Sequence, residues 1–204
     1  MAVIHKATLI PAKLDAISAW LPGQPWSGVA AGTTVEQAGR FRFDDPDGEV
    51  GVETYLVRAG DGPVLHVPLT YRGAPLVGAE AFLVTEMEHS VLGHRWIYDA
   101  VGDPVYADVL RRAIATGGHE AELERASGPG TLEKEGRAIG SGTDPASPTV
   151  TGVEARADGV VTTVTTDHGT LAVLRVLGSD VPAGATLTAG WGTEHSAVVA
   201  VLLP

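Results

Sequence analysis

The 204-residue sequence predicts an α+β protein, with a mostly antiparallel sheet, two main helices and a small C-terminal all-β module. Three observations predict this class. Hydrophobic residues make up 44% of the chain, which is ample for a buried core. Two segments have the apolar spacing of helices, and several others have the composition of strands between turn signals. The chain is therefore expected to be folded rather than disordered.

The first helix is expected at about residues 12–21. Leu14, Ile17 and Leu21 recur there at i, i+3 and i+7, the spacing that places apolar side chains on one helical face. Pro22-Gly23 follows and would end the helix, because both residue types disfavour helical continuation. This segment is therefore expected to supply one amphipathic helix before the sheet begins.

Residues 33–72 are expected to form a β-meander. Three β-prone segments are separated by Asp47-Gly48 and Asp61-Gly62, two pairs that suit tight hairpin turns. Pro68 cannot donate a hydrogen bond to a sheet ladder, so its strand is expected at an edge or a bulge. A further extended segment is expected from Leu92 to Tyr98.

The second helix has clear start and stop signals. Asp103 can cap its N-terminus, Pro104 suits its first turn, and Gly117-Gly118 can end it. Its buried face is expected to consist of Tyr106, Val109, Leu110, Ala113 and Ile114.

A polar segment divides the chain. Residues 118–148 are rich in Gly, Glu, Ser and Pro, so a linker is expected there, with Gly140-Ser141-Gly142 supplying flexibility. It separates an α+β domain at residues 1–117 from a β-rich module at 149–204. The strands of that module are expected near residues 149–156, 160–166, 170–176, 184–190 and 196–203. They either form a module of their own or extend the first sheet.

Composition excludes several function classes. The chain carries 25 acids against 14 bases, for a net charge of −11, and no segment is a basic patch, so a nucleic-acid partner is not expected. The absence of cysteine removes disulfides, thiolate metal sites and a cysteine nucleophile. The N-terminus lacks the apolar stretch of a signal peptide, and no apolar run approaches the roughly 20 residues that span a bilayer. We expect a cytoplasmic, bacterial protein without a membrane partner.

Sequence motifs for catalysis and cofactors are missing. The acidic run at residues 44–49 places its glycine too early for a calcium loop, so a solvated hairpin turn is expected instead. The chain has neither a Gly-x-Ser-x-Gly elbow nor a phosphate-binding glycine loop. No catalytic residue, metal or cofactor is therefore assigned.

Functional groups are densest between Glu86 and Asp99. His89 and His94 are five residues apart, which suits neither one face of a strand nor an i, i+4 helical pair, so a metal site is not expected. A polar ligand or partner surface and an ordinary strand face both stay open. Trp26 follows a Pro-rich turn and could stack on a sugar ring if exposed, although core packing is the alternative for each tryptophan. The candidate surface comprises Trp26, Tyr71, Arg72, Glu86, Glu88, His89, His94, Arg95, Trp96 and Asp99.

Three short motifs follow one another along the first part of the chain. They consist of Leu21, Pro22 and Trp26; Val52, Glu53, His66, Val67 and Pro68; and Tyr98, Asp99, Ala100, Asp103 and Pro104. With the order of the expected elements, these motifs resemble the N-terminal cap of bacterial maltokinases. The resemblance covers roughly residues 1–116 and is closer still to small stand-alone proteins described as maltokinase N-terminal cap-like. It implies a small antiparallel sheet with helix that packs on a kinase of α-glucan and trehalose metabolism.

The kinase itself is missing from this sequence. Residues 117–204 contain no kinase catalytic loop and are too few for its two lobes, so no phosphotransfer residue carries over. Pro25 also stands where the cap turn would have an arginine. We therefore expect a non-catalytic binding or regulatory protein that contacts a protein partner or a copy of itself. The alternative is a small carbohydrate-binding protein or carbohydrate-active enzyme that uses a sugar ligand.

Overall fold

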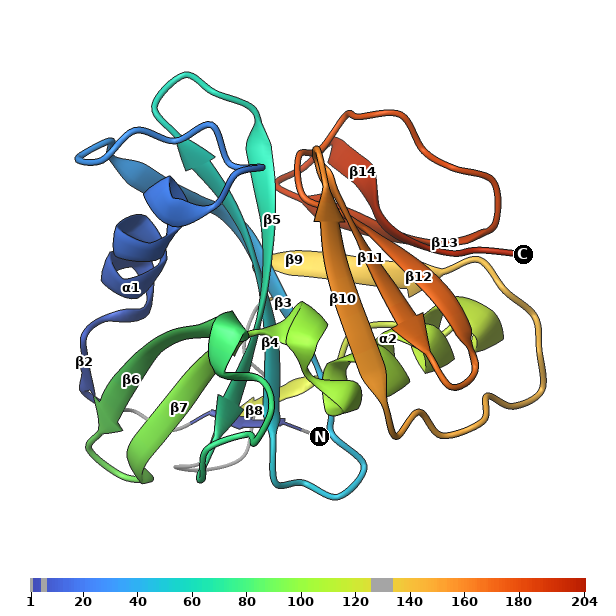
Figure 1. Cartoon of the computed structure of the whole chain (residues 1–204), viewed down its shortest axis with the longest axis horizontal. Coiled ribbons are helices and arrows are strands. Elements are labelled where there is room, and N and C mark those ends of the chain that lie inside the picture. The colour runs from blue at the N-terminus through green and yellow to red at the C-terminus, as the bar shows by residue number, and fades with distance from the viewer. Residues whose placement is uncertain (1, 5–6, 126–133) are drawn as a thin grey trace.

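The chain folds around two six-stranded antiparallel sheets that lie side by side (Figure 1). A computed structural model describes residues 2–4, 7–125 and 134–204. Within these residues two α-helices accompany the sheets, so the predicted α+β class with a C-terminal β-module is confirmed. The helices are α1 (Lys13–Trp20) and α2 (Pro104–Thr116), and the short 3-10 helices are η1 (Leu21–Gly23), η2 (Glu80–Phe82) and η3 (Ala100–Gly102).

The first sheet has the order β2-β6-β7-β5-β4-β3. Its strands are β2 (Leu9–Ile10), β3 (Val35–Phe43), β4 (Gly51–Ala59), β5 (Val64–Arg72), β6 (Leu83–His89) and β7 (Gly93–Asp99). The predicted meander corresponds to β3, β4 and β5. The predicted acidic turn is confirmed too, since the Asp45 carboxylate accepts backbone N–H bonds from Asp47, Glu49 and Val50. The single extended segment expected from Leu92 to Tyr98 is the second strand of a hairpin formed by β6 and β7.

The prediction for Pro68 is wrong, because β5 lies inside the sheet rather than at an edge, and Pro68 pairs with Thr54 without a bulge. On the side away from β4, the N–H of His66 donates to the carbonyl of Arg175 at 2.8 Å, whereas pairing with β7 starts only at Leu69. Pro68 lies at the changeover between these two partners. Its missing N–H therefore breaks no ladder bond.

The second sheet has the order β10-β11-β12-β14-β13-β9. Its strands are β9 (Gly136–Gly140), β10 (Val153–Asp158), β11 (Val161–Thr166), β12 (Gly169–Leu174), β13 (Ala185–Trp191) and β14 (His195–Leu202). Five of these strands match the segments predicted for the C-terminal module. A short parallel pair, β1 (Ala2–Ile4) and β8 (Leu123–Arg125), lies apart from both sheets.

Strand β9 falls within the segment predicted to be a polar linker. Its glycines allow close packing rather than flexibility: a Cβ on Gly140 would lie 1.8 Å from the carbonyl oxygen of Ala113, and one on Gly142 2.1 Å from that of Ala115. The chain thus runs against the C-terminal end of α2, where larger side chains would not fit. The division into separate domains at residues 1–117 and 149–204 stays a prediction.

Helix α2 forms as its sequence signals predict. The Asp103 side chain accepts a hydrogen bond from the N–H of Val105, and Gly117 ends the helix in the left-handed conformation at φ 69°. All five residues of its predicted buried face are buried. They join a core cluster that also contains Phe41, Phe43 and Val52 from the first sheet and Val164, Leu171 and Val199 from the second.

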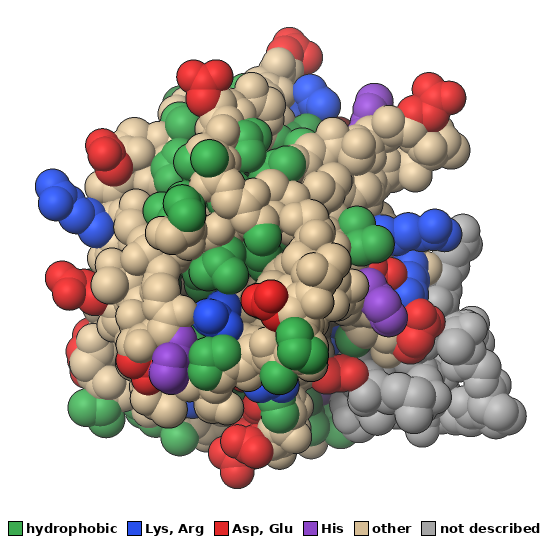
Figure 2. Space-filling view, turned by 90° about the vertical axis from the view of Figure 1, so that its right-hand side faces the viewer, with side chains coloured by type: hydrophobic (Ala, Val, Ile, Leu, Met, Phe, Trp, Pro, Cys, Tyr) green, Lys and Arg blue, Asp and Glu red, His purple; other side chains and the backbone are tan. Residues whose placement is uncertain are grey.

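The two faces of the first sheet are covered differently (Figure 1). Side chains alternate along each strand, so Phe41, Val52 and Leu56 point toward α2 and the second sheet, a side termed the α2 face. Tyr55, Val57 and Leu65 point to the other side, termed the α1 face, where Ile17 and Leu21 pack on them. The surface formed by the second sheet and α2 carries interspersed acidic, basic and apolar side chains (Figure 2).

Candidate ligand site

A cavity of about 730 Å³ lies over the part of the α1 face that α1 does not cover. This volume is within the roughly 300–1,000 Å³ typical of small-molecule sites. Gly51 in β4 leaves room on the sheet surface, because it presents no side chain next to the Tyr71 ring. The lining consists of Ala7, Leu9, Lys13, Arg40, Arg42, Asp44, Asp45, Gly48, Glu49, Val50, Gly51, Val52, Glu53, Tyr71, Met87, His89, Leu92 and Arg95.

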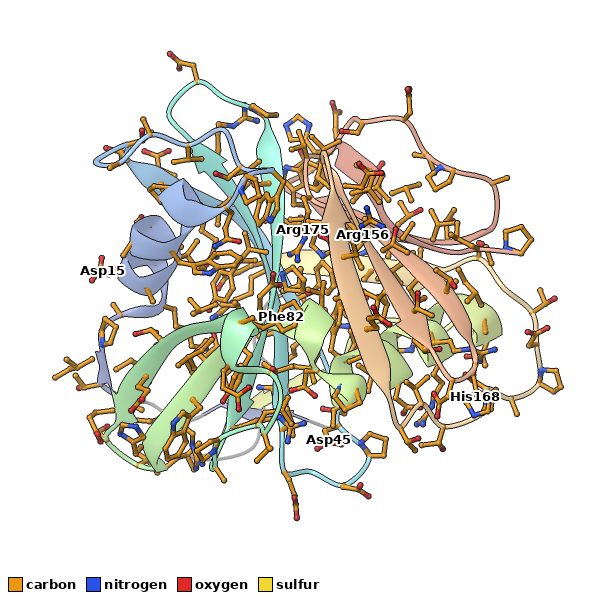
Figure 3. All side chains as sticks on the ribbon, in the orientation of Figure 1. Asp15, Asp45, Phe82, Arg156, His168 and Arg175 are labelled. Carbon is orange, nitrogen blue, oxygen red and sulfur yellow. The ribbon has the colours of Figure 1, made fainter. Side chains whose placement is uncertain are left out.

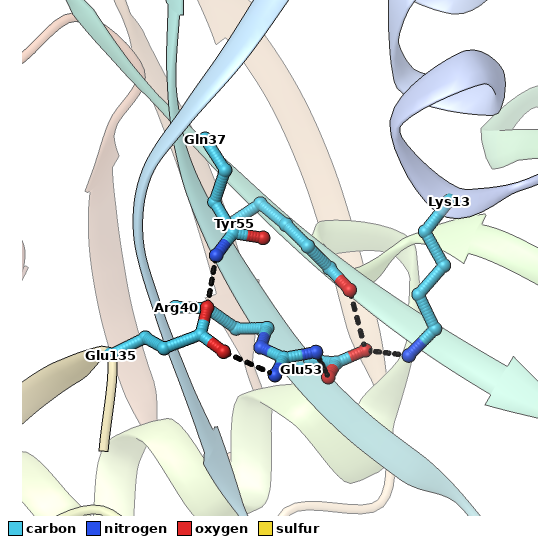
Figure 4. A network of polar contacts seen from close by, with 6 residues as sticks. All are labelled: Lys13, Gln37, Arg40, Glu53, Tyr55 and Glu135. Atoms are coloured by element: carbon cyan, nitrogen blue, oxygen red, sulfur yellow. Dashed lines mark hydrogen bonds and ion pairs between the residues drawn. The ribbon is translucent and has the colours of Figure 1, made fainter. Parts of the chain in front are cut away.

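A polar network centred on Glu53 forms one wall of the cavity (Figure 4). The Glu53 carboxylate forms ion pairs with Lys13 at the start of α1 and with Arg40 of β3, and it accepts a hydrogen bond from the Tyr55 hydroxyl at 3.1 Å. Arg40 also contacts Glu135 at 2.9 Å. The network thus ties the first helix, two strands and the segment before β9 to one another.

Burial and neighbouring charges shift the pKa values of this wall. Burial alone would raise the pKa of Glu53, but Lys13, Arg40 and Arg42 outweigh it and lower that pKa, so the carboxylate stays ionised. Burial and the Glu53 charge raise the pKa of Tyr55, and they also raise that of Tyr71 well above its ordinary value. Both phenols are therefore neutral hydrogen-bonding groups at physiological pH.

The cavity has the chemistry of a binding site. Leu9, Met87 and Leu92 provide apolar surface, whereas Lys13 and Tyr71 provide polar groups, a combination that suits an amphipathic ligand. Glu53 is a poor general base because its pKa is lowered and its oxygens are already paired. In the part of the chain that the structure describes, no three His, Asp or Glu side chains gather so as to hold a metal ion.

The structure divides the predicted candidate surface between two faces of the β6–β7 hairpin. Tyr71, His89 and Arg95 line the cavity. Glu86 lies opposite Trp96, and Glu88 lies opposite His94, in the hairpin register. Because side chains alternate, these four residues lie on the side away from Arg95 and the cavity. The spacing of His89 and His94 indeed places them on different faces.

His94 and its neighbours form a small exposed cluster. Its Nδ1 lies 2.6 Å from a Glu88 oxygen, its Nε2 lies 2.7 Å from a Glu86 oxygen, and its ring contacts Trp96 edge-on. Hydrogen bonds to Glu88 and Glu86 raise the pKa of His94. The cluster is an ordinary cross-strand arrangement of charges on a solvated strand face.

The other predicted surface residues stabilise the fold. Trp26 is only 6% exposed, so the core-packing alternative holds, and its ring lies under the guanidinium of Arg175. Arg72 donates two 2.7 Å hydrogen bonds to the buried carboxylate of Asp103. Asp99 is buried as well, and Arg175 donates to it at 2.6 Å. Figure 3 shows Arg175 between the two sheets.

Several residues of the cavity were missed by sequence analysis. Arg40 and Arg42 are two positions apart on β3 and therefore share a face, and Glu53 lies directly opposite Arg42 on β4. That alternation was a usable signal within the predicted meander. The contribution of Lys13 could not be foreseen, because it depends on how α1 packs on the sheet.

One family model matches part of the chain. Residues 20–103 match the family model of the maltokinase N-terminal cap domain. The matched segment, termed the cap segment, contains β3 to β7 and so supplies most of the cavity lining. No kinase family is found in the chain. A search of curated proteins finds no match. Neither helix of the described residues has the length and apolar character needed to cross a membrane.

Proposed function

We propose that this chain is a non-catalytic binding or regulatory protein of α-glucan, maltose or trehalose metabolism, acting in the cytoplasm. Its cavity over the α1 face holds a small saccharide-type ligand. The observation that carries the proposal is the cavity of about 730 Å³, because its lining combines apolar side chains with several charged and phenolic groups. The cap segment supports the link to maltose metabolism.

A binding role fits the cavity better than catalysis. The most buried acid of the lining, Glu53, is held ionised by Lys13 and Arg40 and cannot take up a proton readily. The Tyr71 hydroxyl is kept neutral by burial. These groups are fixed hydrogen-bonding partners, which suits recognition of sugar hydroxyls.

Thermal unfolding with added ligands tests the proposal. Maltose, glucosamine, maltose 1-phosphate and soluble α-glucan are each added, with ATP as an unrelated nucleotide. A ligand at about 100 times its Kd stabilises the native state by about 2.7 kcal/mol, which raises the Tm by about 5–10 °C for a domain of this size. Turnover of any of these compounds would contradict the non-catalytic assignment.

Two variants locate the binding event. Gly51→Val narrows the cavity beside Tyr71, because the added Cβ would lie 3.4 Å from the Tyr71 Cβ, an ordinary contact, and the methyl groups extend further. It should reduce the ligand-dependent rise in Tm. Trp96→Ala alters the opposite face of the hairpin and should leave that rise unchanged. A rise that Gly51→Val leaves undiminished would place the ligand elsewhere.

A protein partner is the second candidate. Ile10, Val91 and Leu92 are exposed apolar side chains near the β2 edge of the first sheet, where Leu9 pairs with His89. Such a group beside a two-residue edge strand suits contact with another chain or with a second copy. Loss of a stoichiometric complex in Val91→Asp, seen by size-exclusion chromatography with native extract, would favour this role. An unchanged monomer would exclude it.

A further inference from the structure

A smaller pocket of about 110 Å³ lies where the two sheets meet. It is termed the junction pocket, and its walls include Trp20, Trp26, Phe82, Asp99, Thr162 and Arg175. Two of these residues come from the C-terminal half of the chain and four from the N-terminal half, and Figure 3 shows Phe82 and Arg175 at this junction. Among the described residues it shares none with the lining of the cavity over the α1 face, so it is a separate candidate site.

The buried end of the junction pocket is an ion pair with unused hydrogen-bonding groups. Arg175 donates through Nε to Thr162 at 2.9 Å and through Nη2 to Oδ2 of Asp99 at 2.6 Å. Arg175 is only 1% exposed and Asp99 only 5%. Nη1 of Arg175 and Oδ1 of Asp99 are also buried, and neither has a hydrogen-bond partner among the described residues. An unpaired buried donor or acceptor is costly, so a ligand that satisfies both atoms would stabilise the native state.

One small molecule can reach both free atoms. Nη1 shares its carbon with Nη2, and Oδ1 shares its carbon with Oδ2, so each free atom lies one bond angle from the 2.6 Å contact. The volume of the pocket exceeds the roughly 10–15 Å³ that one water needs. Water beyond the first molecule would face Trp20, Trp26 and Phe82, whose rings offer few hydrogen bonds. A ligand with one polar end and one apolar end therefore fits these walls better than water.

We propose that the junction pocket binds a small, neutral primary carboxamide. Its carbonyl oxygen accepts a hydrogen bond from Nη1 of Arg175, its NH2 group donates to Oδ1 of Asp99, and its carbon chain lies against Trp20 and Phe82. The ion pair has no net charge, so a charged ligand would bring an unpaired charge into a buried site, whereas a carboxamide brings none. This ligand would bridge the two sheets and stabilise their junction, independently of a saccharide in the larger cavity.

Four compounds of similar size test the ligand class: propionamide, propionate, protonated propylamine and 1-propanol. Each is titrated into the whole 15N-labelled chain at pH 7, and the side-chain N–H signals of Trp20, Trp26 and Arg175 report binding. We expect propionamide to shift these signals with a Kd on the order of 1 mM, and to bind at least about 10-fold more tightly than propionate or propylamine. 1-Propanol has a single polar atom and should bind more weakly than propionamide.

Two outcomes of this titration would overturn the inference. Equal binding of all four compounds would mean that the apolar walls alone are used and that the ion pair does not select a carboxamide. Absence of shifts at about 100 times the expected Kd of propionamide would leave the pocket to water.

Ala157→Leu locates the binding event. Ala157 lines the junction pocket, lies opposite Thr162 in the strand register and is exposed, so a larger side chain there can narrow the pocket without disturbing the core. It should weaken propionamide binding at least about 10-fold. Ala183→Leu is the matched control, because it makes the same change at an exposed residue outside the lining, and it should alter the Kd by less than about 2-fold. The same Kd in both variants would contradict binding in this pocket.

Asp99→Asn should invert the ligand preference. The new amide keeps an oxygen for Arg175 and presents an N–H group where Oδ1 accepts, so the pocket then offers two donors and a net positive charge. Propionate should bind this variant at least about 10-fold more tightly than propionamide does. A retained preference for propionamide would overturn the assigned contacts. If this variant does not fold, the comparison of propionamide with propionate in the wild-type chain and the Ala157→Leu titration still test them.

Discussion

Two regions of the first sheet differ in how their charged groups are satisfied. Where the first sheet meets the second, Asp99 and Arg175 are buried between the sheets, and Arg175 is only 1% exposed. Around the cavity, Glu53 pairs with Lys13 and Arg40, which are 25% and 29% exposed at their side chains. The first sheet thus has a sealed ion pair at its junction with the second sheet and a partly hydrated network at the cavity.

One sheet can therefore serve both stability and binding. The second sheet attaches to β5 through backbone hydrogen bonds at His66 and Leu177, and it shields the α2 face from water. The α1 face keeps a cavity because α1 is short and covers only part of the sheet. Changes at the junction between the sheets should therefore mainly affect stability, and changes around the cavity should mainly affect ligand binding.

The largest effect is expected from Arg175→Met. Removing this guanidinium leaves the Asp99 carboxylate buried without its partner, so the free energy of unfolding should fall by about 3–5 kcal/mol. Urea unfolding at pH 7 measures it. The double variant Asp99→Leu with Arg175→Met should recover much of the loss, because no charge stays buried. Equal losses in the single and double variants would show that the ion pair is not the cause.

The next effect concerns the contact between β9 and α2. Gly140→Ala places a Cβ against the Ala113 carbonyl and should cost about 1–3 kcal/mol. Gly152→Ala is the matched control, since a Cβ there meets no atom within 4 Å, and it should change stability by less than about 0.5 kcal/mol. A loss in Gly140→Ala as small as that in Gly152→Ala would indicate that the segment before β10 is a loose linker.

Acid should weaken the junction through His66. Burial and the nearby Arg175 charge lower the pKa of His66 from its ordinary 6.5 to about 3. Below pH 6.5 the unfolded chain binds the proton and the folded chain does not, so stability is full above pH 6.5 and lost as the pH falls. The expected slope is about 1.4 kcal/mol per pH unit. Urea unfolding between pH 7 and 5 should show it, and His66→Gln should flatten it. An equal slope in that variant would assign the loss to other groups.

The smallest loss of stability is expected on the α1 face. Glu53→Gln leaves Lys13 and Arg40 without their shared carboxylate, but both retain access to water, so the cost should be only about 1–2 kcal/mol. The free energy of ligand binding should weaken by more than the free energy of unfolding, because the cavity wall loses the carboxylate that positions Lys13 and Arg40. A loss as large as that of Arg175→Met would remove the distinction between the junction and the cavity.

Local signals in the sequence predicted much of the fold. Asp103, Pro104 and Gly117 fix the ends of α2 through contacts within a few residues, and the predicted C-terminal strands follow their turn glycines. Strand β9 was missed because its glycines have the composition of a linker, and only the approach of α2 explains them.

The site was only partly predictable. Tyr71, His89 and Arg95 were identified, but Glu86 and His94 were grouped with them because sequence distance does not separate the two faces of a hairpin. The turn before Trp26 suggests an exposed stacking residue, whereas Trp26 is buried and contacts Arg175, about 150 residues away. Contacts between distant segments are what the sequence alone does not specify.

The most direct test of the cavity as a ligand site is chemical-shift mapping of the 15N-labelled chain during titration with maltose. Shifts are expected at Gly51, Tyr71 and Arg95, with little change at Trp96 on the opposite face or along β10. Shifts confined to Trp96 and His94, or no shifts at millimolar maltose, would contradict it.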